Sequence, residues 1–175
     1  MGGFIGTKEG VEKYARDLVA DWTDQLETLS QIAKSEPQAA YSAFTARFRH
    51  KLSYFIRTIP ELHTPGILQP FDDKINNVFI PAITEGHICS RDDRRLLSLP
   101  VRMGGMGIPI FSDSAVAEYQ NSKNVTTYLR EKVLAQESDF QPDAQQQKQI
   151  ESNIRKEREE KHNIMLEQVR NNMSK

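Results

Sequence analysis

The stretch LLSLPVRMGGMGIPIF, residues 96–111, guides the interpretation of the whole chain. Its leucines are typical of the end of a helix with an apolar side, and Pro100 prevents a regular helix from continuing. The glycines at 104, 105 and 107 free the backbone to adopt a positive φ or to lie close to a bulky neighbour. Ordering glycine costs more conformational entropy than ordering other residues. We therefore expect this segment to serve packing, the more frequent reason, or the close approach of a ligand.

The composition is that of one domain with a polar extension. The chain has 175 residues, of which 38% are hydrophobic and 27% charged, and its formal net charge is −1. This length suffices for a substantial core. Because the net charge is close to zero, only an uneven distribution of charge would point to a nucleic-acid partner. The single cysteine, Cys89, excludes an internal disulfide framework and fits a reducing compartment.

The sequence also bears on location. No run reaches the roughly 18 apolar residues of a membrane span, and the N-terminus lacks the basic and apolar regions of a secretory signal. We therefore expect an intracellular protein, nuclear or cytoplasmic, without a membrane partner.

Apolar residues repeat every three or four positions over much of the chain, which predicts amphipathic helices. The first runs from about Glu9 to Lys34, the second from about Gln38 to Ile59, and the third from about Pro70 to Ile83. Pro81 is expected to kink or end the third helix. The fold class is mainly α, a thumb-like helical bundle in outline.

The second helix has an aromatic face and a basic face. Its apolar stripe is Tyr41, Phe44, Phe48, Leu52, Phe55 and Ile59. The basic residues Arg47, Arg49, Lys51 and Arg57 lie beside or opposite that stripe, and the interval between Gln38 and Pro60 contains no Asp or Glu. This basic face is either a solvated surface that pairs with acids elsewhere or a surface that contacts phosphates.

Two further helices and an arm follow. Ser90 is suited to cap a short helix that leads to Leu99. Ser112 or Asp113 is expected to cap a helix that reaches about Gln136, with an apolar side made of Val116, Tyr119, Leu129 and Val133.

The segment from Asp143 to about Met173 has helical propensity but a thin apolar stripe. It predicts a charged arm that lies outside the core, frays or pairs weakly as a coiled coil. The chain thus divides into a hairpin or strand remnant at 1–8, a helical domain at 9–136 and the arm at 137–175.

Catalytic and metal-binding patterns are weak. The pairs Asp72-Asp73 and Asp92-Asp93 could hold Mg²⁺, but acids at helix starts are favoured by the helix dipole alone. His87 and Cys89 lack the further ligands that a structural zinc site needs. There is no phosphate-binding loop and no dinucleotide fingerprint. We therefore predict no catalytic residues, no metal and no cofactor.

The stretch at 96–111 also resembles a known family when it is read with PQAAYSAFTARFRHKLSYFIRTIP, residues 37–60, and FIPAITEGHICS, residues 79–90. It is similar to the region after the palm in reverse transcriptases of retrotransposons that lack long terminal repeats. The residues that match the family's LP-x-R-x-GG-x-GI pattern are Leu99, Pro100, Arg102, Gly104, Gly105, Gly107 and Ile108. The segment GGFIG at 2–6 is similar to the end of the hairpin that follows the catalytic strands, and the resemblance ends near Tyr119.

The resemblance implies a nucleic-acid-gripping thumb from an RNA-directed DNA polymerase. It implies that Arg47, Arg49, Lys51 and Arg57 face an RNA or DNA duplex. It also places Phe4, Ile5 and Gly6 near the primer end.

The family's catalytic aspartates lie in an aromatic-x-Asp-Asp turn within the upstream palm, and this chain begins after that point. We expect no polymerase activity from the chain itself. Two other interpretations stay open: a helical module that binds protein, and a translated relic of a mobile element.

Overall fold

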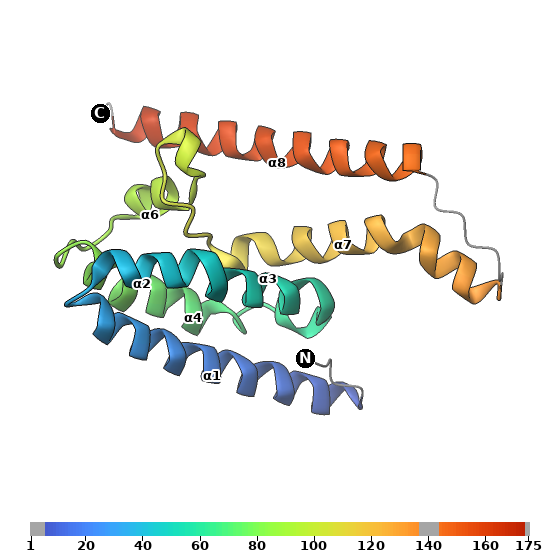
Figure 1. Ribbon diagram of the computed structural model, residues 1–175, viewed down its shortest axis with the longest axis horizontal. Helices are drawn as coiled ribbons and strands as arrows, with labels where there is room; N and C mark the ends of the chain where they lie inside the picture. The colour runs from blue at the N-terminus through green and yellow to red at the C-terminus, as the bar shows by residue number, and fades with distance from the viewer. Residues whose placement is uncertain (1–5, 137–143, 174–175) are drawn as a thin grey trace.

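The computed structural model describes residues 6–136 and 144–173, and these residues are mainly α-helical, with no strand among them. Helices α1, α2, α3 and α4 form a bundle that the start of α7 joins, and α8 runs along the side formed by α6 and α7 (Figure 1). The predicted mainly α fold class is confirmed. No helix in the described ranges combines the length and apolar character that crossing a membrane requires.

Helix α1, Lys8–Ala33, begins where the Thr7 hydroxyl accepts a hydrogen bond from the Gly10 N–H at 3.2 Å. Its buried side includes Trp22, which is 0% exposed and packs against the rings of Phe55 and Phe71. These contacts explain why the predicted stripe forms one side of a core helix. Of the predicted remnant at 1–8, Phe4 and Ile5 lie outside the described residues, and Gly6 is exposed.

The second predicted helix is continuous but contains one wider turn. It consists of α2, Pro37–Ala43, the π turn η1, Phe44–Phe48, and α3, Arg49–Thr58. In the π turn the Arg49 N–H donates to the Phe44 carbonyl, five residues earlier. The short helix η2, Pro60–His63, and Gly66, with φ +85°, then form the connection to the next helix.

The third predicted helix consists of α4, Gln69–Lys74, the π turn η3, Ile75–Phe79, and α5, Ile80–Ile83. Pro81 neither donates a backbone hydrogen bond nor tolerates the carbonyl four residues earlier. The π turn directly before it shifts the bonding pattern, since the Ile80 N–H donates to the Ile75 carbonyl. The helix therefore accommodates Pro81 and ends two residues later.

Helix α6, Arg91–Ser98, begins with the predicted cap at Ser90, which forms a reciprocal capping box with Asp93. Helix α7, Phe111–Leu134, begins differently, because neither Ser112 nor Asp113 caps it. Instead the buried Asp72 carboxylate accepts the Phe111 N–H at 2.9 Å and the Ser112 N–H at 2.8 Å. The predicted cap was wrong because a carboxylate from another helix already satisfies these donors.

The apolar side predicted for α7 is mostly uncovered. Val116, Leu129 and Val133 are 63%, 47% and 66% exposed, and Tyr119 is half-buried. Only the first turns of the helix, at Phe111 and Ala115, enter the core. Leu129 and Val133 are exposed because the later part of α7 extends beyond the bundle (Figure 1).

The glycine segment folds back over the C-terminal end of α6. After η4, Val101–Met103, the N–H groups of Met106 and Ile108 donate to the Leu97 carbonyl, and that of Gly107 donates to the Leu99 carbonyl. These bonds satisfy carbonyl groups that a helix end leaves without partners. A Cβ on Gly105 would collide with the Leu96 and Leu99 carbonyl oxygens, so this position requires glycine.

Side chains from other helices hold the outer edge of the same segment. The Tyr41 hydroxyl donates to the Met106 carbonyl at 2.6 Å. Arg94, 8% exposed, donates to the carbonyls of Ile108 and Pro109, both at 2.8 Å. The segment therefore joins α6 to the main bundle.

Helix α8, Ala144–Met173, confirms that the arm is helical and shows that it has a packed end. Val169 is 1% exposed, and the Ser98 hydroxyl lies 3.4 Å from the Met165 sulfur. Contacts with α6 and α7 hold the helix against the rest of the chain. The weak coiled-coil partner stays a prediction.

Candidate nucleic-acid interface

A row of basic and aromatic side chains follows the exposed side of η1 and α3. We define the basic stripe as Arg47, His50, Lys51, Tyr54 and Arg57, whose spacing of three to four residues places them on one side of the helix. Arg47 and His50 are exposed and make no hydrogen bond or ion pair with the described residues. Lys51 Nζ lies 3.3 Å from the neutral amide oxygen of Gln25. Within residues 6–136 and 144–173, no carboxylate pairs with this part of the stripe.

A groove of about 730 Å³ between α1 and the π turn borders the stripe. Its apolar residues include Leu29, Ile32 and Phe48, and Ile32 is 48% exposed. Arg47, His50, Lys51 and Tyr54 also line the groove, and its lining contains no Asp or Glu. Positive charge therefore surrounds an apolar surface.

Arg49 does not join the basic stripe. Its side chain is half-buried on the opposite side of the helix and donates to the Gly107 carbonyl at 3.0 Å. Within the predicted set, the structure brings Arg47 and Lys51 together and assigns Arg49 to the glycine segment.

Arg57 is the last residue of the basic stripe and also lines a second cavity. Its Nε and Nη2 atoms lie 2.9 and 2.7 Å from Oε2 of Glu118 on α7. The other carboxylate oxygen, Oε1, accepts from Nη2 of Arg158 on α8 at 2.7 Å. Glu118 thus links α3, α7 and α8 through two guanidinium groups.

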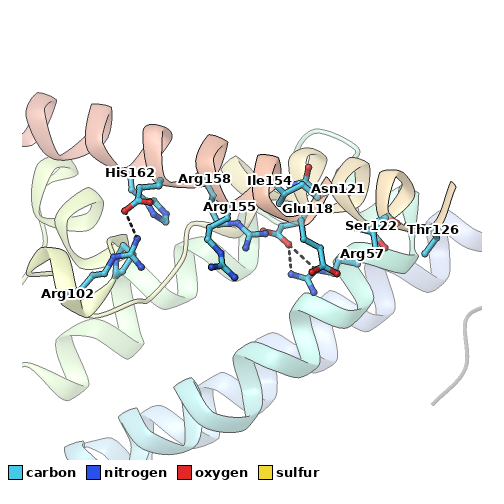
Figure 2. Close-up of a pocket in the computed structure, with 14 residues that line it drawn as sticks. Arg57, Arg102, Glu118, Asn121, Ser122, Thr126, Ile154, Arg155, Arg158 and His162 are labelled. Atoms are coloured by element: carbon cyan, nitrogen blue, oxygen red, sulfur yellow. Dashed lines mark hydrogen bonds and ion pairs between the residues drawn. The ribbon is translucent and has the colours of Figure 1, made fainter. Parts of the chain in front are cut away.

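We define the arginine cleft as this second cavity, about 740 Å³ in volume (Figure 2). Arg57 from α3, Arg102 from η4, and Arg155 and Arg158 from α8 line it, together with Glu118, Glu151 and Glu159. Arg102 pairs with Glu159 at 3.3 Å, while Arg155 makes no hydrogen bond or ion pair with the described residues. Four guanidinium groups from three elements therefore meet at one place.

The pKa of His162 reflects the burial and the charges of the arginine cleft. Burial lowers the pKa of its imidazole, and Arg102, Arg158 and Lys161 lower that pKa further, against a smaller opposite effect of Glu159. Beyond the effect of burial, the three cations around the imidazole therefore outweigh the one carboxylate.

Sequence reasoning did not identify Arg155 and Arg158, because their charges alternate with glutamates along the arm. The signal that could have found them is helical spacing. Ile154, Arg155, Arg158 and His162 are separated by one, three and four residues, which places them on one side of α8.

The residues of the glycine pattern have mixed surroundings. Leu99 and Ile108 are buried, Gly104, Gly105 and Gly107 lie in the turn that covers the end of α6, and Pro100 and Arg102 line the arginine cleft. Within the described residues, no three or more His, Cys, Asp or Glu side chains gather in a way that could hold a metal ion.

Comparisons with protein families, curated proteins and solved structures find no match for this chain.

Proposed function

We propose that the protein binds the sugar-phosphate backbone of an RNA or DNA duplex through the basic stripe, without sequence preference. The observation that carries this proposal is that Arg47, His50 and Lys51 have no carboxylate partner in the part of the chain that the structure describes. In a chain with 23 basic and 24 acidic residues, such a surface has a local excess of positive charge. The resemblance to a polymerase thumb supports the same function.

The dimensions suit a short contact with a backbone. Arg47 and Arg57 are ten residues apart, which corresponds to roughly 15 Å along a helix, or about four base pairs of duplex at 3.4 Å each. Contacts to phosphates position a protein but carry no base information. With the two cations Arg47 and Lys51 engaged, affinity at physiological salt should lie in the range of about 10⁻⁴ to 10⁻⁶ M that is typical of non-specific binding.

The first test replaces Arg47 and Lys51 with glutamine in one variant, because glutamine keeps a fair helix propensity. Each exposed phosphate contact should contribute about 0.5–0.7 kcal/mol, so the double variant should bind a labelled duplex about five- to tenfold more weakly at low salt. Fluorescence anisotropy measures this affinity, and circular dichroism checks that the helix content is unchanged.

The matched control replaces Lys8 and Arg16 with glutamine. Both residues are exposed, and neither lines the groove or the second cavity. It removes the same charge and should change the affinity less than twofold, an order-of-magnitude expectation for distant screened charges. Equal losses of duplex affinity in both variants would show that only net charge matters. That result would contradict the proposal that the basic stripe binds the duplex.

The apolar lining of the groove favours a second candidate function. Leu29, Ile32 and Phe48 form a surface suited to the apolar side of a partner helix, and the basic rim suits acidic residues on that helix. A parent chain that fails to bind any duplex at low salt would favour this protein-binding function over the first.

A further inference from the structure

The arginine cleft holds many more hydrogen-bond donors than its own acceptors use. Each guanidinium group carries five N–H donors. Internal carboxylates take two from Arg57 and one each from Arg102 and Arg158, and Arg155 gives none. Glu118 and Glu159 are already engaged and Glu151 accepts from Gln147, so the remaining donors are open to an acceptor from solution.

The walls of the cleft define the size and kind of ligand. A volume of about 740 Å³ is within the range of small-molecule sites, roughly 300–1,000 Å³. The polar side chains of Asn121, Ser122 and Thr126 line α7 opposite the arginines of α8 (Figure 2). Phosphate oxygens accept hydrogen bonds and match the planar donor pairs of arginine.

We propose that the arginine cleft binds a compact anion that carries several phosphate groups. Arg155 and Arg158 on α8 and Arg102 on η4 provide the principal donors, and Arg57 adds donors from α3. The site is separate from the basic stripe apart from Arg57, and it does not depend on the duplex-binding function. Its ligand bridges α8 to the remainder of the chain, because its donors come from both.

Because the ligand bridges α8 to the remainder of the chain, binding of polyphosphate and ionic screening by salt should affect α8 differently. Sodium chloride weakens the exposed ion pairs of Arg57, Arg102 and Arg158. A bound polyphosphate instead adds bonds across the same cleft and stabilises the contact of α8. Polyphosphate and chloride at equal ionic strength should therefore change the hydrogen exchange of α8 in opposite directions, slower with polyphosphate and faster with chloride.

The probe for the main test is inorganic tripolyphosphate, titrated into the full chain by calorimetry. Arg155→Gln is the principal variant, because Arg155 makes no hydrogen bond or ion pair with the described residues that the substitution would remove. Losing one charge-assisted donor group should weaken binding about tenfold, and Arg155→Gln with Arg158→Gln should weaken it further. The variant Lys148→Gln with Lys156→Gln changes two exposed lysines of α8 outside the cleft and should bind within about twofold of the parent, since screened charges act weakly.

A second measurement follows the imidazole of His162 by NMR. The groups that face it are Arg102, Arg158, Lys161 and Glu159. Added negative charge favours the imidazolium, so tripolyphosphate should raise the pKa of His162. This shift should shrink in Arg155→Gln.

Three results would overturn the proposal: tripolyphosphate binding that Arg155→Gln leaves intact, no binding by the parent chain, or an unchanged His162 resonance on saturation. Loss of duplex binding in Arg155→Gln without any tripolyphosphate binding would also overturn it, and would assign the cleft to nucleic acid. Failure of the stripe variants to lose duplex affinity has no bearing on these outcomes.

Discussion

Replacing Gly105 with alanine should leave little folded protein. The new Cβ would overlap the backbone carbonyl oxygens of Leu96 and Leu99. The segment cannot move away without breaking the hydrogen bonds from Met106, Gly107 and Ile108 to the end of α6. We expect a loss of about 4 kcal/mol or more, a large part of the roughly 5–15 kcal/mol that stabilises a typical domain. Urea denaturation followed by circular dichroism measures this loss.

Gly104→Ala is the matched control. Gly104 has a φ of +86°, but a Cβ there would meet no atom within 4 Å. The substitution should cost only about 1–2 kcal/mol, from the unfavourable left-handed backbone. Equal stabilities of the two variants would contradict the packed position of Gly105.

Replacing Asp72 with alanine should cost about 3 kcal/mol, because it leaves two backbone N–H groups of α7, one buried and one partly buried, without their acceptor. For a chain of this length, the melting temperature should fall by roughly 6–12 °C. Differential scanning calorimetry measures the change. Asp72→Asn, which keeps one acceptor oxygen, should lose less.

The neighbouring Asp73 provides the control for this prediction. Its carboxylate is exposed and accepts a hydrogen bond from Gln69 at 2.8 Å. Asp73→Ala should change the free energy of unfolding by only about 0.5 kcal/mol. A melting temperature equally lowered in both variants would show that Asp72 does not act as the cap of α7.

Local patterns predicted the helices well, because a buried stripe leaves a repeat in the sequence. The apolar spacing around Trp22 placed α1 to within one residue at each end. The π turns before Arg49 and Ile80 were not predicted, since one extra residue in a turn hardly changes that spacing. Pro81 was recognised as a disturbance, but its accommodation depends on the preceding turn.

Features that depend on tertiary contacts could not be predicted from local sequence patterns. The role of Asp72 at the start of α7 joins residues 39 and 40 positions apart in sequence. The arginine cleft likewise requires α8 to lie beside α7, which the alternating charges of the arm do not indicate. The sequence therefore predicted Arg57 as a basic surface residue, but not its ion pair with Glu118.

The most direct test of the duplex-binding function is the salt dependence of affinity. Each phosphate neutralised contributes about −0.9 to the slope of log K against log salt concentration. If Arg47 and Lys51 contact the backbone, the parent chain should give a slope of about −2, and the Arg47→Gln, Lys51→Gln variant a slope of about zero, with duplexes of unrelated sequence. A slope that stays the same in this variant, or that depends on the duplex sequence, would contradict the proposal that the basic stripe binds the backbone.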